Sequence, residues 1–181
     1  MKKRVIALLM AVVTIFGMLA VPANAASLND SGSVTIQYLG RNEYLSKSTG
    51  GSLSGSSWSY TSNDGLTGTA YCVNWGLTAV SPSKSLTLQE YNRSPKTMGV
   101  FANGYPNRTL AQFKELHADD VRGIASLTED EYKYATQIAV WASCGQLSVP
   151  GTSFTSRRAA LVEPPADAQK TRIFHSIKAM L

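Results

Sequence analysis

Residues 128–145, with the sequence TEDEYKYATQIAVWASCG, decide much of this fold. Thr128 and Glu131 have the spacing of a capping box, in which each side chain bonds the backbone N–H of the other residue. This pattern predicts a helix that begins after Thr128 and runs to about Cys144, where Gly145 suits the C-terminal cap. The stretch 138–142 is apolar on nearly every side, which is typical of a buried helix. A buried helix is therefore expected in the second half of the chain.

Gln137 is an awkward residue inside this helix. At about 100° per residue it falls beside Val140, Trp141 and Cys144, at the edge of the buried surface. A primary amide has two N–H donors and one carbonyl to satisfy, and an unmet group costs about 1–3 kcal/mol. Either Gln137 has polar partners, which is the simpler interpretation, or its amide nitrogen has been lost in a reaction.

Cys72 is the thiol that could carry out such a reaction. If residues 68–75 form a strand, alternate side chains lie on opposite faces. The small face then contains Ala70, Cys72 and Asn74, and the bulky face contains Tyr71, Val73 and Trp75. A helix could approach the small face closely, and a Cys72 thiolate could attack the Gln137 amide, release ammonia and leave an internal thioester. Trp141, one turn after Gln137, is expected to shield that bond.

The chain divides into a β-rich part, residues 26–105, and a helical part, residues 106–181. In the first part, alternation at Val34, Ile36 and Tyr38 predicts a strand. The Ser/Gly-rich stretch 46–57 predicts a loop, and Asp64-Gly65 predicts a hairpin turn between strands 58–61 and 66–73. In the second part, helices are expected over 109–117, 119–126 and 166–181. The predicted fold class is α+β. The last helical pattern reaches the final residue, so we expect a truncated domain.

The N-terminus has the pattern of a secretory signal peptide over residues 1–25. Lys2, Lys3 and Arg4 precede an apolar run, and Ala23-Asn24-Ala25 forms a cleavage site. After cleavage, 14 Lys and Arg face 12 Asp and Glu, which argues against a nucleic-acid-binding protein. No second long apolar run predicts a membrane span. A secreted, extracellular or cell-wall-associated protein is expected.

Two motifs resemble the thioester domains of surface adhesins from Gram-positive bacteria. Such domains carry an aromatic-Cys pair and, well downstream, Thr-Gln-x-Ala-hydrophobic-Trp. Tyr71-Cys72 matches the first motif, and residues 136–141, TQIAVW, match the second at all specified positions. Residues 127–135 also resemble the family, and the resemblance covers about 34–181.

The resemblance implies an autocatalytic thioester between Cys72 and Gln137, with Tyr71, Thr136, Ala139 and Trp141 as supporting residues. It also implies a fold that combines a β-sandwich-like part with a helical part. The expected function is that of an adhesin module that captures a host-surface or matrix protein covalently, through a lysine amine. Such a module is monomeric, needs no cofactor and modifies itself rather than turning over substrate.

Two other interpretations remain open from the residues. An exported chain with two cysteines often forms one disulfide, so a non-covalent binding domain with a Cys72–Cys144 bridge is the first alternative. A cysteine hydrolase would need a histidine beside Cys72, and only His117 and His175 are present. Two cysteines and two histidines so far apart in sequence do not suggest a zinc site.

Overall fold

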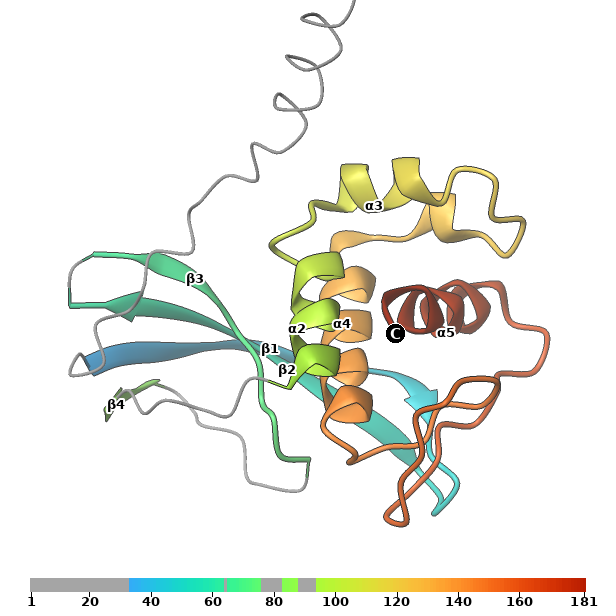
Figure 1. The fold of residues 1–181 in the computed structure, drawn as a ribbon, viewed down its shortest axis with the longest axis horizontal. Coiled ribbons are helices and arrows are strands. Elements are labelled where there is room, and N and C mark those ends of the chain that lie inside the picture. The colour runs from blue at the N-terminus through green and yellow to red at the C-terminus, as the bar shows by residue number, and fades with distance from the viewer. Residues whose placement is uncertain (1–32, 64, 76–82, 88–93) are drawn as a thin grey trace, which may run out of the picture.

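The computed structural model describes residues 33–63, 65–75, 83–87 and 94–181 (Figure 1). The signal peptide predicted over residues 1–25 lies outside these ranges. The described residues combine one antiparallel sheet with helices, so the α+β prediction is confirmed. The four strands have the order β3-β2-β1-β4. Their bounds are β1 Ser33–Ser46, β2 Ser52–Ser62, β3 Thr67–Ala70 and β4 Ser83–Thr87.

Strand β2 corrects the prediction of a loop over residues 46–57. Its register runs from Ser46 opposite Ser52 to Val34 opposite Ser62, so pairing with β1 outweighs the low β-propensity of a Ser/Gly-rich segment. The ladder has register shifts between Tyr38 and Gly40 and between Asn42 and Leu45, and in the short turn after β1, Gly50 and Gly51 have φ values of 89° and 74°. The predicted hairpin between β2 and β3 is confirmed by antiparallel pairing from Thr61 to Trp58.

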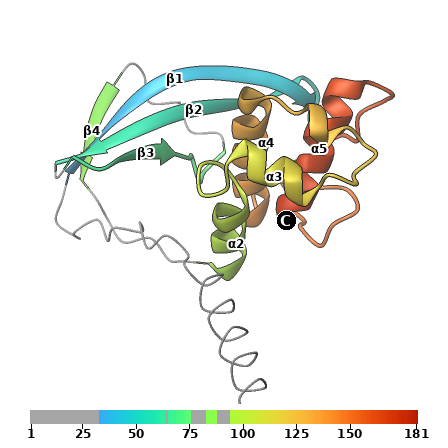
Figure 2. The ribbon, with the colours of Figure 1, turned by 90° about the horizontal axis from the view of Figure 1, so that it is seen from above.

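Five helical segments follow the sheet in sequence. They are α2 Pro95–Asn103, α3 Leu110–Leu116, the 3-10 turn η1 Ile124–Ser126, α4 Glu129–Ser143 and α5 Ala168–Met180. The helix expected over 119–126 is thus reduced to one short turn. The first described helix, α2, begins ahead of residue 106, where the helical part was expected to start. Figure 2 shows the helices gathered at one end of β1 and β2.

Helix α4 begins as the sequence predicted. Thr128 Oγ1 accepts from the Glu131 N–H at 3.3 Å, and Glu131 Oε2 accepts from the Thr128 N–H at 2.9 Å. At the other end Cys144 is the cap residue, and Gly145 has a φ of 70°, a conformation that glycine adopts without strain. The helix therefore spans the interval that the capping box and the glycine define.

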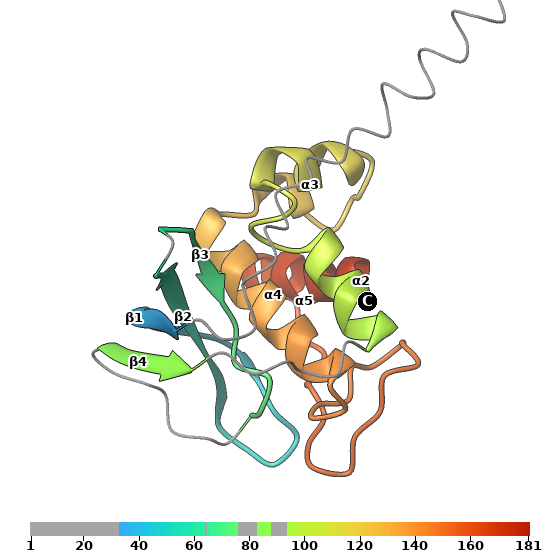
Figure 3. The same ribbon diagram turned by 60° about the vertical axis from the view of Figure 1, so that its left-hand side comes forward.

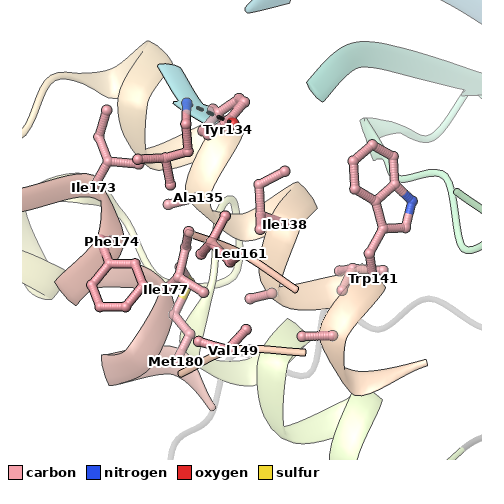
Figure 4. Packing of buried hydrophobic residues seen from close by; sticks show 14 of the residues in the cluster. Tyr134, Ala135, Ile138, Trp141, Val149, Leu161, Ile173, Phe174, Ile177 and Met180 are labelled. Atoms are coloured by element: carbon pink, nitrogen blue, oxygen red, sulfur yellow. Dashed lines mark hydrogen bonds between the residues drawn. The ribbon is translucent and has the colours of Figure 1, made fainter. Parts of the chain in front are cut away.

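The core is built around α4, which contacts α2, α5 and β2 (Figure 3). Ile138, Ala139 and Val140 have no exposed surface. Figure 4 shows the α5 side chains Ile173, Phe174, Ile177 and Met180 on one side of α4, and Trp141 pointing to the opposite side. The apolar character all round the helix is thus explained by neighbours on every side.

Two polar contacts fix α4 in place. The Tyr134 hydroxyl donates to the Leu53 carbonyl of β2 at 2.8 Å, and the Tyr134 ring lies so close to Gly55 that a Cβ there would be 2.7 Å from Cδ2. On the α5 side, the Glu131 carboxylate, 1% exposed, accepts from both Arg172 and Gln169. Helix α4 is thereby bound to the sheet and to α5.

In the part of the chain that the structure describes, none of the helices is long and apolar enough to cross a membrane.

Candidate functional site

Cys72 lies in the segment that leaves the sheet after β3. Because β3 ends at Ala70, the prediction of a strand over 68–75 is wrong from Tyr71 onward. The segment instead crosses to α4 and packs against the core. Cys72 is half-buried, and its thiol donates to the Asn74 carbonyl at 3.2 Å. The thiol is therefore at the boundary between sheet and helix, as predicted, but on a loop.

The side-chain amide of Gln137 is hydrogen-bonded to the backbone of Cys72. Gln137 Oε1 accepts from the Cys72 N–H at 2.9 Å, and Gln137 Nε2 donates to the Cys72 carbonyl at 2.8 Å. The glutamine is 1% exposed, so these two bonds supply partners that water cannot. The simpler interpretation of Gln137, a core amide with polar partners, is correct for this state, and the partner is the cysteine itself.

The Cys72 N–H faces the side-chain oxygen of Gln137. A nucleophile that adds to Gln137 Cδ drives negative charge onto Oε1, and a donor about 2.7–3.1 Å from that oxygen stabilises the intermediate. The Cys72 N–H, at 2.9 Å, already occupies this position. The Cys72 N–H is therefore placed where an oxyanion donor for attack on Gln137 Cδ would lie, a position that side-chain motifs in the sequence could not reveal.

Tyr71 and Thr136, the residues that precede the pair, meet at Tyr105. The Tyr71 hydroxyl donates to the Tyr105 carbonyl at 2.5 Å, and Thr136 Oγ1 accepts from the Tyr105 N–H at 3.2 Å while donating to the Tyr132 carbonyl at 2.9 Å. Tyr71 therefore points toward α4, which corrects its expected place on the far face of a strand. Burial raises the pKa of Tyr71 well above its usual range, so its hydroxyl stays protonated. Sequence reasoning missed Tyr105, because no local pattern marks it.

Trp141 is 5% exposed and forms part of an aromatic layer beside Gln137. The ring centroids of Trp141 and Trp75 are 6.5 Å apart. The Arg158 guanidinium lies over the Trp75 ring, 5.6 Å from its centroid. Arg158 also donates to Asn74 Oδ1 at 3.4 Å. We call Trp141, Trp75 and Arg158 the tryptophan cap. It joins α4, the Cys72 segment and the loop before α5, and the shielding role of Trp141 stays a prediction.

Ala139 and the indole nitrogen of Trp141, both in the second motif, are buried. Ala139 has no exposed surface and belongs to the hydrophobic core. Its supporting role in the site stays a prediction. Trp141 Nε1 is buried without a hydrogen-bond partner among the described residues. An unmet buried donor of this kind costs about 1–3 kcal/mol.

The structure does not bring Cys72 together with the residues that the other interpretations need. Both cysteines are free, and Cys144 Sγ lies 3.7 Å from Thr97 Oγ1 at the end of α4. The His117 ring packs on Phe113 with centroids 4.7 Å apart, and His175 packs on Phe174 at 5.5 Å. Within the described ranges, no group of three or more His, Cys, Asp or Glu side chains is arranged to hold a metal ion.

The fold and the paired Cys72 and Gln137 define a protein with a cysteine–glutamine site at the junction of a sheet and a helix. The family model described as "Thioester domain" matches residues 69–172, which is more than half of the chain and includes both motifs. The chain therefore belongs to the thioester domain family. No curated protein and no solved structure matches it.

Proposed function

We propose that this chain is a secreted surface-adhesin module in which Cys72 and Gln137 condense without an enzyme into an internal thioester. The thioester then captures amines of host-surface or matrix proteins covalently. The observation that carries this proposal is the reciprocal pair of hydrogen bonds, 2.9 and 2.8 Å long, between the Gln137 amide and the Cys72 backbone. Membership of the thioester domain family supports it.

In the first step, the Cys72 sulfur attacks Gln137 Cδ. A C–S bond forms, the C–N bond of the amide breaks, and the thiol proton leaves with the nitrogen as ammonia. The Cys72 N–H stabilises the oxyanion on Oε1 while the bond changes take place. The core position of Gln137 keeps water away from the product, and the tryptophan cap closes the site beside it.

In the second step, the neutral amine of a lysine side chain attacks the same carbon. An amide bond forms, the C–S bond breaks, and the amine proton passes to the sulfur and restores the thiol. Gln137 is left as a substituted amide joined to the target. Because the target stays joined to Gln137 and is not released as a product, the module is a covalent binder rather than a turnover enzyme.

The extracellular setting of the proposal follows from the sequence. The signal-peptide pattern over residues 1–25 directs export, and thioester domains occur in surface proteins. Outside the cell, such a module meets lysine amines on host-surface and matrix proteins. The β-sandwich-like architecture and the monomeric state remain part of the same proposal.

Intact-mass measurement of the mature protein tests the first step. We expect a mass lower than the sequence mass by one ammonia, and covalent addition of methylamine at Gln137. Cys72→Ala should abolish both effects, because it removes the nucleophile and keeps the Gln137 hydrogen bonds to the backbone. Cys144→Ala is the matched control, since it removes the other thiol and should leave both effects unchanged.

The same measurement separates the alternatives. A disulfide would lower the mass by two hydrogens and leave no thiol to alkylate. A full-mass protein with two alkylatable thiols would refute the thioester and the disulfide together. The target class is tested by incubating the protein with matrix proteins before and after acetylation of their lysines, since acetylation should prevent the covalent adduct.

A further inference from the structure

One residue outside both motifs joins the two halves of the site. Tyr105 accepts from the Tyr71 hydroxyl through its carbonyl and donates to Thr136 Oγ1 through its N–H. Tyr71 immediately precedes Cys72, and Thr136 immediately precedes Gln137. The backbone of a single residue therefore holds the chain next to each reaction partner.

The segment that carries Tyr105 is itself firmly held. Residues 103–105, which run from the last residue of α2 into the loop before α3, form what we call the 103–105 segment. The Tyr132 hydroxyl donates to the Asn103 carbonyl at 2.9 Å, and the Gly104 N–H donates to Val100 O at 2.8 Å.

Gly104 fits closely against α4. A Cβ on this residue would lie 2.6 Å from Thr136 Cγ2 and 2.9 Å from Val100 O, so even an alanine would force the segment away from the helix. The absence of a side chain thus lets the backbone N–H of the next residue reach the Thr136 hydroxyl. The segment has little room to move relative to α4.

We infer that the 103–105 segment is a positioning element for thioester formation, which sets Cys72 opposite Gln137 by holding Tyr71 and Thr136. This inference rests on the proposed function. Sulfur must reach Gln137 Cδ at about 3–3.5 Å with the correct alignment, and a displacement of about 1 Å can slow such a reaction roughly 100-fold. Tyr71 fixes the entry of the Cys72 segment, and Thr136 fixes the helix turn that presents Gln137.

The aromatic and threonine positions of the two motifs gain a physical reason from this arrangement. Neither Tyr71 nor Thr136 serves as a base here, because each hydroxyl donates its proton to a backbone carbonyl. Both are positioning residues that act through Tyr105. Removing either hydroxyl should loosen one side of the site. The Cys72 thiol and the Gln137 amide themselves are both retained in such a variant.

The test follows ammonia loss with time after cell-free synthesis of the mature chain, by intact mass. Tyr71→Phe and Thr136→Val should each slow thioester formation about 10- to 100-fold. Tyr134→Phe is the matched control, since it removes a buried tyrosine hydroxyl whose hydrogen bonds go to the Leu53 carbonyl and the Leu45 N–H of the sheet rather than to the 103–105 segment. Tyr134→Phe should lower the melting temperature by about as much as Tyr71→Phe or Thr136→Val does, and it should leave the rate of ammonia loss unchanged.

The double variant distinguishes positioning from general loosening. Because both hydroxyls act through Tyr105, the fold-changes of Tyr71→Phe and Thr136→Val should not multiply. If wild-type protein never loses ammonia, the proposed function itself fails. If wild type condenses and both variants condense as fast as Tyr134→Phe, the positioning role is refuted while the proposed function stands. If Thr136→Val does not fold, Tyr71→Phe against Tyr134→Phe decides.

Discussion

Replacing Gln137 by glutamate puts the hydrogen bonds at the core of the site to a direct test. The substitution keeps the shape of the side chain and Oε1, which accepts from the Cys72 N–H. It replaces Nε2, which donates to the Cys72 carbonyl at 2.8 Å, by an oxygen. An ionised carboxylate would then place two oxygen acceptors against each other in a site that is 1% exposed. The same group arises when water opens the thioester, so the variant also represents the hydrolysed protein.

The expected loss of stability in Gln137→Glu follows from the burial of the side chain and from the lost hydrogen-bond donor. A protonated carboxyl can still donate to the Cys72 carbonyl, so folding favours the neutral form and raises the pKa above the usual value of about 4.3. A rise of about two to three pKa units is ordinary for a fully buried carboxyl. At about 1.4 kcal/mol per unit, this corresponds to roughly 3–4 kcal/mol of lost stability at neutral pH.

The direction of the pH dependence is fixed by the raised pKa. Below about pH 4 the carboxyl is protonated in both the folded and the unfolded chain, and the penalty is absent. As the pH rises through the interval between the unfolded and folded pKa values, the folded state retains a proton that the unfolded state has lost, so the free energy of unfolding falls. Above the pKa of the folded state, the loss in the free energy of unfolding no longer changes with pH.

The assay compares two chains that cannot form a thioester. Cys72→Ala retains the Gln137 amide, and the double variant Cys72→Ala/Gln137→Glu carries the carboxyl. Thermal unfolding from pH 4 to pH 8 should show a gap that opens with rising pH and reaches roughly 6–16 °C, given about 2–4 °C per kcal/mol for a domain of about 150 residues. A gap that is absent or independent of pH would refute the buried hydrogen-bond pair between Gln137 and Cys72.

Two further predictions concern the surroundings of the site. Arg172→Met leaves the Glu131 carboxylate buried without its guanidinium and should cost about 3–5 kcal/mol in urea unfolding at pH 7; a loss below 1 kcal/mol would contradict the buried ion pair. Burial alone raises the pKa of Glu131, but hydrogen bonds from Arg172 and its other donors hold that pKa below its usual value. The stabilisation from the Glu131–Arg172 pair should therefore be present at neutral pH and be lost as the pH falls through the acidic range. Trp75→Ala should open the tryptophan cap and speed hydrolysis of the thioester about 10-fold, as measured by intact mass over time, whereas Arg158→Ala should have a smaller effect; equal rates in all three proteins would show that water does not enter past Trp75.

Helix α4 could be predicted from the sequence because its determinants are local. A capping box, a C-terminal glycine and an apolar centre all lie within residues 128–145, and each acts over one or two turns. The pairing of Cys72 with Gln137 was reached by physical reasoning together with the family motifs. Neither required knowledge of how the rest of the chain packs.

The errors lie where distant contacts override local composition. Strand β2 forms in a Ser/Gly-rich segment because β1 supplies pairing partners from Ser52 to Ser62, interrupted by two register shifts. Conversely, the apolar and aromatic residues after Ala70 suggested a continuing strand, but the chain turns away to meet α4. Tyr105 has no sequence signature at all, since it acts through its backbone, and backbone groups are the same in every residue other than proline.

The position of Cys72 relative to Gln137 is set by two routes through the molecule. One runs through the sheet, where β3 pairs with β2 at Ala70 and Trp58, and β2 packs on α4 with Gly55 against the Tyr134 ring. The other runs through Tyr105. Each route ends on α4 within one turn of Gln137, because residues 134 and 136 both precede it closely. A site held at two points resists rotation as well as translation, and a reaction between two side chains needs both distance and alignment. The fold alone therefore holds the Cys72 backbone against the Gln137 side chain.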